Sequence, residues 1–189
     1  MEFESTQKIQ SQLSSGESLL WTGRPRQGIL FRASDGFIIP FSLLWCGFAI
    51  FWEFSAYKSG APAFFLLFGG AFVVIGLYFV FGRFVVDSIQ RRNMYYGITD
   101  ERILIHSEFP SIKTKSLSLS TLSDISIVSK PNGMGTITFG PQHPMAAMMT
   151  GMNWPGMGAY QGPSFDMIEN AKSVYGTIQR AKRERGNAT

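Results

Sequence analysis

The sequence predicts an α+β protein in which a transmembrane helical hairpin is followed by an antiparallel β-meander and a final helix. Two long apolar segments, Phe37–Trp52 and Ala63–Phe81, are separated by a short polar stretch. From Met94 to Gly140 apolar and polar residues alternate, which is the period of half-buried strands. Near the C-terminus, an apolar stripe at helical spacing predicts a helix that lies over the sheet.

The second apolar segment gives the clearest membrane signal. It has neither a charged residue nor the polar stripe that a helix of a soluble domain carries. About 20 residues at about 1.5 Å each cross a hydrocarbon core of about 30 Å. We therefore expect a hairpin over residues 37–86, with its second helix continuing to Arg92 and stopping at Asn93. Four glycines are expected to allow close contact of the two helices: Gly47, Gly69, Gly70 and Gly76.

Charges around the hairpin predict its orientation. The break between the spans offers one basic residue, Lys58, whereas arginines precede the first span and follow the second: Arg24, Arg26, Arg32, Arg83, Arg91 and Arg92. By the positive-inside rule both termini then face the cytoplasm. A cleaved signal peptide is not expected, because the first apolar run begins only at Phe37 and a second span follows it. The single cysteine, Cys46, excludes an intrachain disulfide framework and a multi-cysteine metal site.

The segments on either side of the hairpin are predicted from their composition and turns. Residues 1–16 are polar and predict a loosely ordered segment or a short helix. Residues 17–25 contain apolar positions followed by Gly and Pro, which predicts a short strand. Within the meander, turns are expected at Thr99–Arg102, at Phe109–Ser111 and at Pro131–Gly133, whose Asn-Gly pair is a strong hairpin signal.

The final helix is predicted to begin at Ser164. Ser is a favoured N-cap, and Asp166 and Glu169 would place acidic side chains in the first turn. Its apolar stripe consists of Phe165, Ile168, Ala171, Val174, Tyr175 and Ile178. Between the meander and this helix lies a Met/Gly/Pro-rich stretch over residues 141–163, which predicts a long loop.

Two motifs and the order of the parts point to a known family. Gly16–Pro25 reads Gly-Glu-x-Leu-Leu-Trp-x-Gly-Arg-Pro, the two-span hairpin follows, and Tyr96–Arg102 reads Tyr-x-Ile-Thr-x-x-Arg. In this order the chain resembles the bacterial pleckstrin-homology-like (PH-like) membrane proteins, formerly grouped as a domain of unknown function. The resemblance covers most of the chain from Gly16 to Ala181. It implies a partly open, PH-like antiparallel β-barrel capped by the C-terminal α-helix.

The resemblance also implies a division of the chain. Residues 17–25 would form the first barrel strand, the hairpin would be an insertion before the second strand, and residues 94–184 would form a PH-like cytoplasmic domain. The implied location is the bacterial cytoplasmic (inner) membrane, as a multi-pass protein with both termini in the cytoplasm. Family knowledge supplies no reaction, since domains of this shape bind lipids or proteins.

The expected function is that of a binding and scaffold module at the cytoplasmic face, which recruits proteins or contacts anionic lipid. Its partners would be the bilayer and either another protein or further copies of this chain. Basic residues beside an anionic leaflet are attracted to it, and the candidate lipid or partner contacts are Arg83, Arg91, Arg92, Lys113, Lys115 and Trp154. Nucleic acid is excluded as a partner, because the net charge of +4 is dispersed and no aromatic–basic alternation occurs.

Three alternatives remain at this point. The Met-rich stretch could hold Cu(I) or serve a redox role, since thioethers prefer soft ions; the candidate ligands are His143, Met148, Met149 and Met152. A small membrane enzyme would need His106 or His143, but neither lies near a recognisable nucleophile, so no catalytic residue and no cofactor are predicted. Glu53 lies at the predicted end of the first span, where an acid can serve transport or proton transfer.

Overall fold

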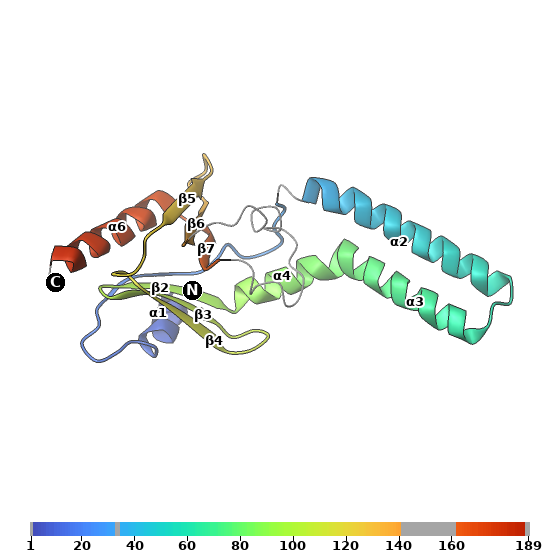
Figure 1. Cartoon of the computed structure of the whole chain (residues 1–189), viewed down its shortest axis with the longest axis horizontal. Helices are drawn as coiled ribbons and strands as arrows, with labels where there is room; N and C mark the ends of the chain where they lie inside the picture. The colour runs from blue at the N-terminus through green and yellow to red at the C-terminus, as the bar shows by residue number, and fades with distance from the viewer. Residues whose placement is uncertain (1, 33–34, 141–161, 188–189) are drawn as a thin grey trace.

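A computed structural model describes residues 2–32, 35–140 and 162–187 of the chain. A long helical hairpin projects from a body made of two β-sheets and two further helices (Figure 1). The hairpin and the body are joined by α4 and by the segment that follows β1, so both connections lie at one end of the body.

Two apolar helices form the hairpin, as the sequence predicts. The first is α2 (Asp35–Lys58); the second consists of α3 (Ala63–Leu77), a π-helical turn η1 (Tyr78–Gly82) and α4 (Arg83–Arg92). Asn93 is the C-cap of α4, which confirms the predicted stop. Both helices are long and apolar enough to cross a membrane. Of the 18 most apolar consecutive residues in each, only 17% are buried in the first helix and 11% in the second. Within the described residues, neither helix is buried in a protein core.

Close contact of α2 and α3 depends on two of the four predicted glycines. A Cβ at Gly76 would come within 3.0 Å of the Cys46 backbone, and one at Gly69 would overlap the Glu53 carboxylate. Gly47 and Gly70 have nothing within 4 Å of such a Cβ, so the prediction of close helix contact there is wrong. Gly69 and Gly76 are seven residues apart, two helical turns, and so share one face of α3.

Four strands form the first sheet, in the order β1-β2-β3-β4, with all neighbours antiparallel. The strands are β1 (Leu19–Gly23), β2 (Met94–Thr99), β3 (Arg102–Ser107) and β4 (Lys113–Ser118). The strand predicted before the hairpin therefore pairs with the first strand after it. The hairpin is an insertion between two adjacent strands, because the chain leaves the sheet at Gly23 and returns at Met94, the start of β2, where Gly23 pairs with Tyr96.

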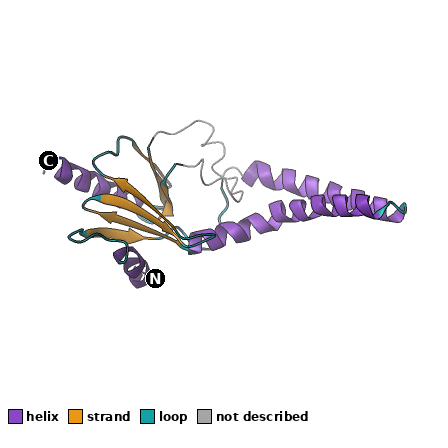
Figure 2. Ribbon diagram, turned by 60° about the horizontal axis from the view of Figure 1, so that its bottom comes forward, coloured by secondary structure: helices purple, strands orange, loops and turns teal. Residues whose placement is uncertain are grey.

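The second sheet consists of β5 (Ile125–Ser129), β6 (Gly135–Phe139) and β7 (Ser164–Ile168), in that order, with α6 (Ala171–Asn187) packed against it. Figure 2 shows the two groups of strands and the helices around them. Phe165 on β7 joins the sheets, since its ring stacks on Tyr96 at 4.6 Å and contacts Phe139 at 5.0 Å. The seven described strands form two sheets and no closed barrel.

The prediction that the final helix begins at Ser164 is wrong. Ser164–Ile168 is the strand β7, and the helix begins at Ala171. The pairing of β6 with β7 shifts register between Gly135 and Ile137, and Met167 has a φ of 47°. This irregularity places Phe165 and Ile168, three residues apart, both in the core. A bulged strand therefore imitates the spacing of a helix.

The polar N-terminal segment contains a helix, α1 (Glu2–Gln10), which covers the outer face of the first sheet. Ile9 packs there against Tyr95 and Leu104 in a second, small core. Gly97 permits this contact, because a Cβ at that position would lie 2.6 Å from Ile9. Of the two predicted alternatives for residues 1–16, the short helix is the one observed.

Candidate functional site at the base of the hairpin

A group of buried and half-buried charges lies where the hairpin meets the sheets. It contains three arginines and three aspartates, which we call the basal cluster: Arg32, Asp35, Arg83, Asp87, Arg91 and Asp166. Since the three positive and three negative charges cancel, the cluster can be enclosed without leaving an uncompensated charge.

Ion pairs in this cluster tie the two helices of the hairpin together and to the linker before α2. Arg83 and Asp35 form a pair at 2.7 Å, with side chains only 8% and 6% exposed. Arg91 pairs with Asp87 one turn earlier on α4 at 2.7 Å. It also donates to the backbone carbonyl oxygens of Arg26 and, at 2.6 Å, Gly28. The start of α2, the linker and α4 are thereby held in one arrangement.

Arg32 and Asp166 extend the cluster to both sheets. Arg32 lies between two carboxylates, 3.3 Å from Asp87 on α4 and 2.8 Å from Asp166 on β7. Asp166 also accepts a hydrogen bond from the Thr136 hydroxyl on β6 at 3.1 Å. Its backbone N–H donates to the Tyr96 hydroxyl on β2, and burial raises the pKa of that phenol, so it stays neutral. The hairpin is thus fastened to both sheets.

The local sequence explains the geometry of α4. Arg83, Asp87 and Arg91 are spaced four residues apart, so they lie on one face of the helix with alternating charge. The ion-pair network along α4 was not predicted, because these arginines were interpreted as signals of membrane topology and of lipid contact. The alternating Arg-x-x-x-Asp-x-x-x-Arg pattern could have indicated an internal ion-pair network. Its partners Asp35 and Asp166 come from distant segments and had no such local signal.

The residues that carry the family resemblance form a separate structural contact at the far end of the first sheet. Arg102 donates two hydrogen bonds of 2.8 Å to the Glu17 carboxylate, whose side chain is 1% exposed. The Thr99 hydroxyl donates to Glu17 at 2.7 Å and accepts the Arg102 backbone N–H at 2.9 Å. The Arg102 guanidinium lowers the pKa of Glu17 to about 2. These motif residues fasten β1 and the N-terminal segment to the sheet.

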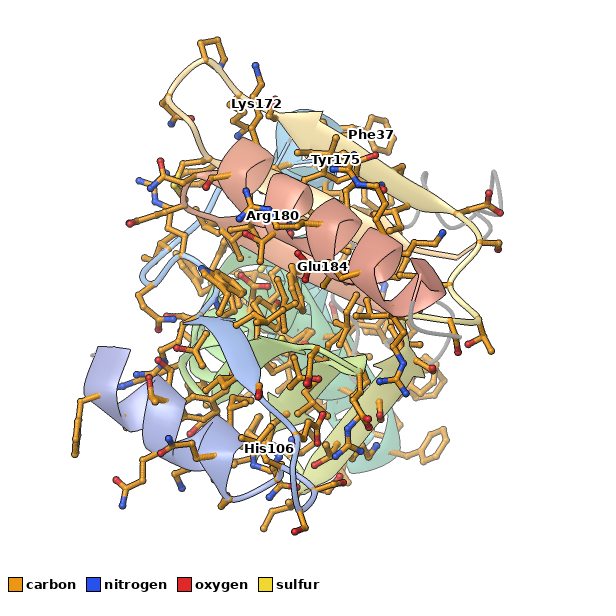
Figure 3. The ribbon with its side chains drawn as sticks, turned by 90° about the vertical axis from the view of Figure 1, so that its left-hand side faces the viewer. Phe37, His106, Lys172, Tyr175, Arg180 and Glu184 are labelled. Carbon is orange, nitrogen blue, oxygen red and sulfur yellow. The ribbon has the colours of Figure 1, made fainter. Side chains whose placement is uncertain are left out.

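His106 lies on the face of the first sheet that α1 covers (Figure 3). Its side chain points away from the main core, and α1 leaves it only 4% exposed. Its Nδ1 lies 2.8 Å from the Thr114 hydroxyl and its Nε2 3.5 Å from Glu108, which in turn binds Lys8 of α1 at 2.6 Å. These contacts fasten α1 to β3 and β4, which is a structural role.

The predicted contact residues fall into three groups. Arg83 and Arg91 are part of the basal cluster, where aspartates neutralise them. Arg92, Lys113 and Lys115 are exposed. Trp154 and the metal candidates lie outside the described residues: His143, Met148, Met149 and Met152. In the part of the chain that is described, no three His, Cys, Asp or Glu residues gather to hold a metal ion.

Glu53 lines an apolar recess of 410 Å³ between the outer halves of α2 and α3. The recess extends over two helical turns and is completed by Ile50, Phe54, Tyr57, Leu66 and Val73. Within the described structure, the Oε2 atom of Glu53 is buried without a hydrogen-bond partner. It lies against Gly69.

Comparison with protein-family models, with curated proteins and with solved structures finds no match to this chain. The family resemblance therefore stays a prediction from the residues quoted above.

Proposed function

We propose that this chain is a membrane-anchored, PH-like scaffold protein of the bacterial cytoplasmic membrane, which recruits protein partners at the cytoplasmic face. The observation that carries this proposal is the way the hairpin is built into the sheets. It enters between adjacent strands β1 and β2, and the basal cluster joins it to both sheets. Such a body is presented to partners in a fixed orientation.

The surface of the hairpin supports placement in lipid. Its helices expose many large apolar side chains, among them Phe41, Leu44, Phe48, Phe51, Phe64 and Leu67. A continuous apolar surface of this kind is unfavourable in water and favourable in a hydrocarbon. The spans are helices, whose backbone groups are satisfied internally, as a bilayer requires.

Span length supports a position for the bilayer boundary. The 15 residues of α3 and the five residues of η1 form an uncharged stretch over residues 63–82, which is 20 residues long. At about 1.5 Å each they extend about 30 Å, the thickness of the hydrocarbon core. Arg83 follows directly and pairs with Asp35 at the start of α2, so the basal cluster would lie at the inner boundary. The arginines at this end and the lone Lys58 at the other favour both termini in the cytoplasm.

The arrangement of the body supports the PH-like assignment. Two antiparallel sheets of four and three strands enclose one core with α6.

The edge strands of the sheets offer a surface for protein partners. β4 lies at one edge of the first sheet and β5 at one edge of the second. Edge strands keep unpaired backbone groups that can bind a further strand. Val128 on β5, 71% exposed, marks such a surface.

Photo-crosslinking in native membranes tests recruitment. A photoreactive amino acid would replace, one at a time, Leu20 on β1, Val128 on β5 or Lys172 on α6 in the whole chain. All three side chains are exposed. At least one of these positions should give a discrete protein adduct. The same photoreactive amino acid in place of Phe51, on the lipid-facing side of α2, should give adducts with lipid. No protein adduct from any of the three positions would overturn the scaffold role.

A further inference from the structure

The turn between β3 and β4, residues 108–112, lies at the hairpin end of the body. In the first sheet Met94, the residue at which the chain arrives from α4, pairs with Ser107, and Ser107 pairs with Lys113. The end of β3 and the start of β4 are therefore beside the end of α4, and Figure 1 shows the turn on the same side of the body as α4. The opposite turn, at Thr99–Arg102, faces away from the hairpin.

This turn combines exposed apolar side chains with two exposed lysines. Ile112 is 76% exposed and Phe109 38%. Lys113 and Lys115 follow on one face of β4 and are exposed, and neither forms an ion pair with another described residue. The acid in the turn, Glu108, is already paired with Lys8 at 2.6 Å. The turn therefore presents apolar groups beside uncompensated positive charge.

The turn can reach the bilayer that would hold the hairpin. The proposed bilayer boundary lies at Arg83, the first residue of α4, and the ten residues of α4 place the start of the first sheet at most about 15 Å further along the helix. Two residues of an extended turn at about 3.3 Å each shorten this gap to about 8 Å. The headgroup layer on one side of a bilayer is about 5–7 Å thick, so it fills most of the remaining space. Phe109 and Ile112 are the side chains at that level.

We propose that this turn is a second membrane contact: Phe109 and Ile112 enter the headgroup layer, and Lys113 and Lys115 bind the phosphates of anionic glycerophospholipids. Lysine provides a compact charge that is attracted to an anionic leaflet without a shaped pocket. A bilayer also satisfies both halves of the surface at once, the apolar tip and the adjacent charge. The contact rests on the proposed membrane anchoring and would fix the tilt of the body on the surface.

Fluorescence quenching in vesicles tests this contact with the whole chain, since a fragment beginning at Met94 would lack β1 and α1. In a Cys46→Ala background, Ile112→Cys carries an environment-sensitive fluorophore. The chain is reconstituted into phosphatidylcholine vesicles with or without phosphatidylglycerol, with a nitroxide quencher near the lipid headgroups. The fluorophore at position 112 should be quenched more strongly when phosphatidylglycerol is present. Ser120→Cys, at the far end of the first sheet, is the matched control and should not be quenched.

Charge variants test the lysines. In the phosphatidylglycerol vesicles, Lys113→Gln and Lys115→Gln should each lower the ratio of docked to undocked turn about fivefold. The corresponding Arg variants should retain it. Quenching at position 112 that is no stronger than at position 120 would overturn the contact. Quenching at position 112 that appears only after a membrane protein extract is added would also overturn it. Quenching that is independent of phosphatidylglycerol would overturn the role of the lysines.

A third label position separates this inference from the proposed function. Phe51→Cys lies on the exposed surface of α2. If its fluorophore resists a quencher placed deep in the bilayer, the hairpin is not in lipid and the proposed function itself fails. If position 51 is quenched and position 112 is not, only the second membrane contact fails.

Discussion

Breaking the basal cluster at Asp87 should destabilise the junction between hairpin and sheets. Asp87→Asn removes the charge that pairs with both Arg91 and Arg32. Removing one partner of a buried ion pair costs about 3–5 kcal/mol. The lower end applies here, because Arg91 keeps its bonds to the Arg26 and Gly28 carbonyls and Arg32 keeps Asp166. We expect a loss of about 3 kcal/mol, which is roughly a hundredfold in the opening equilibrium.

Hydrogen exchange of the whole chain in lipid nanodiscs measures this loss locally. Amides of α4 and of β7 should exchange about a hundredfold faster in Asp87→Asn. Amides at the Glu17–Arg102 contact should change little, because that contact lies at the far end of the first sheet. Glu184→Gln, an exposed change on α6, is the matched control and should stay within about 0.5 kcal/mol. Protection of α4 and β7 unchanged in Asp87→Asn would refute the view that the cluster joins the two parts.

Three further predictions concern other parts of the chain. Because Arg102 lowers the pKa of Glu17 from 4.5 to about 2, this pair contributes stability that is present above pH 4.5 and is lost as the pH falls toward 2. Glu17→Gln should therefore flatten the acid-unfolding curve in that window, and an unchanged slope would contradict the pairing. Gly76→Leu should destabilise the hairpin by about 1–3 kcal/mol in detergent, since its Cβ would meet the Cys46 backbone, whereas Gly47→Leu faces open space and should be tolerated. Glu53→Leu removes a buried oxygen that has no hydrogen-bond partner among the described residues, and it should raise stability by about 1–3 kcal/mol; a loss of stability would indicate a partner for Glu53.

Local patterns predicted the hairpin and the meander. The uncharged apolar run Ala63–Phe81 is typical of a membrane-spanning helix, and the alternation of apolar and polar residues after Met94 is typical of β-strands. The turn at Thr99–Arg102 was readable because the Thr99 hydroxyl caps it locally. The Asn-Gly turn was readable because Gly133 adopts a positive φ of 81°. Each of these features is decided within a few residues.

Features that depend on distant partners could not be read from the sequence. β7 is a strand because Phe165 and Ile168 both reach the core from an irregular pairing with β6, which no local spacing reveals. α1 forms a second core only because Tyr95 and Leu104 leave an apolar patch on the outer face of the first sheet. The basal cluster joins segments as far apart as Arg32 and Asp166. In each case tertiary contacts determine which structure forms, because the local sequence is compatible with more than one.

Cysteine labelling in intact bacterial cells tests the placement of the chain most directly. In the Cys46→Ala background, Ser59→Cys in the loop between α2 and α3 and Lys172→Cys on α6 are both exposed positions. A membrane-impermeant maleimide added outside should label position 59 in intact cells and position 172 only after the membrane is opened. Labelling of position 172 in intact cells, or release of the chain from the membrane by alkaline carbonate, would contradict a body held at the cytoplasmic face by a lipid-embedded hairpin.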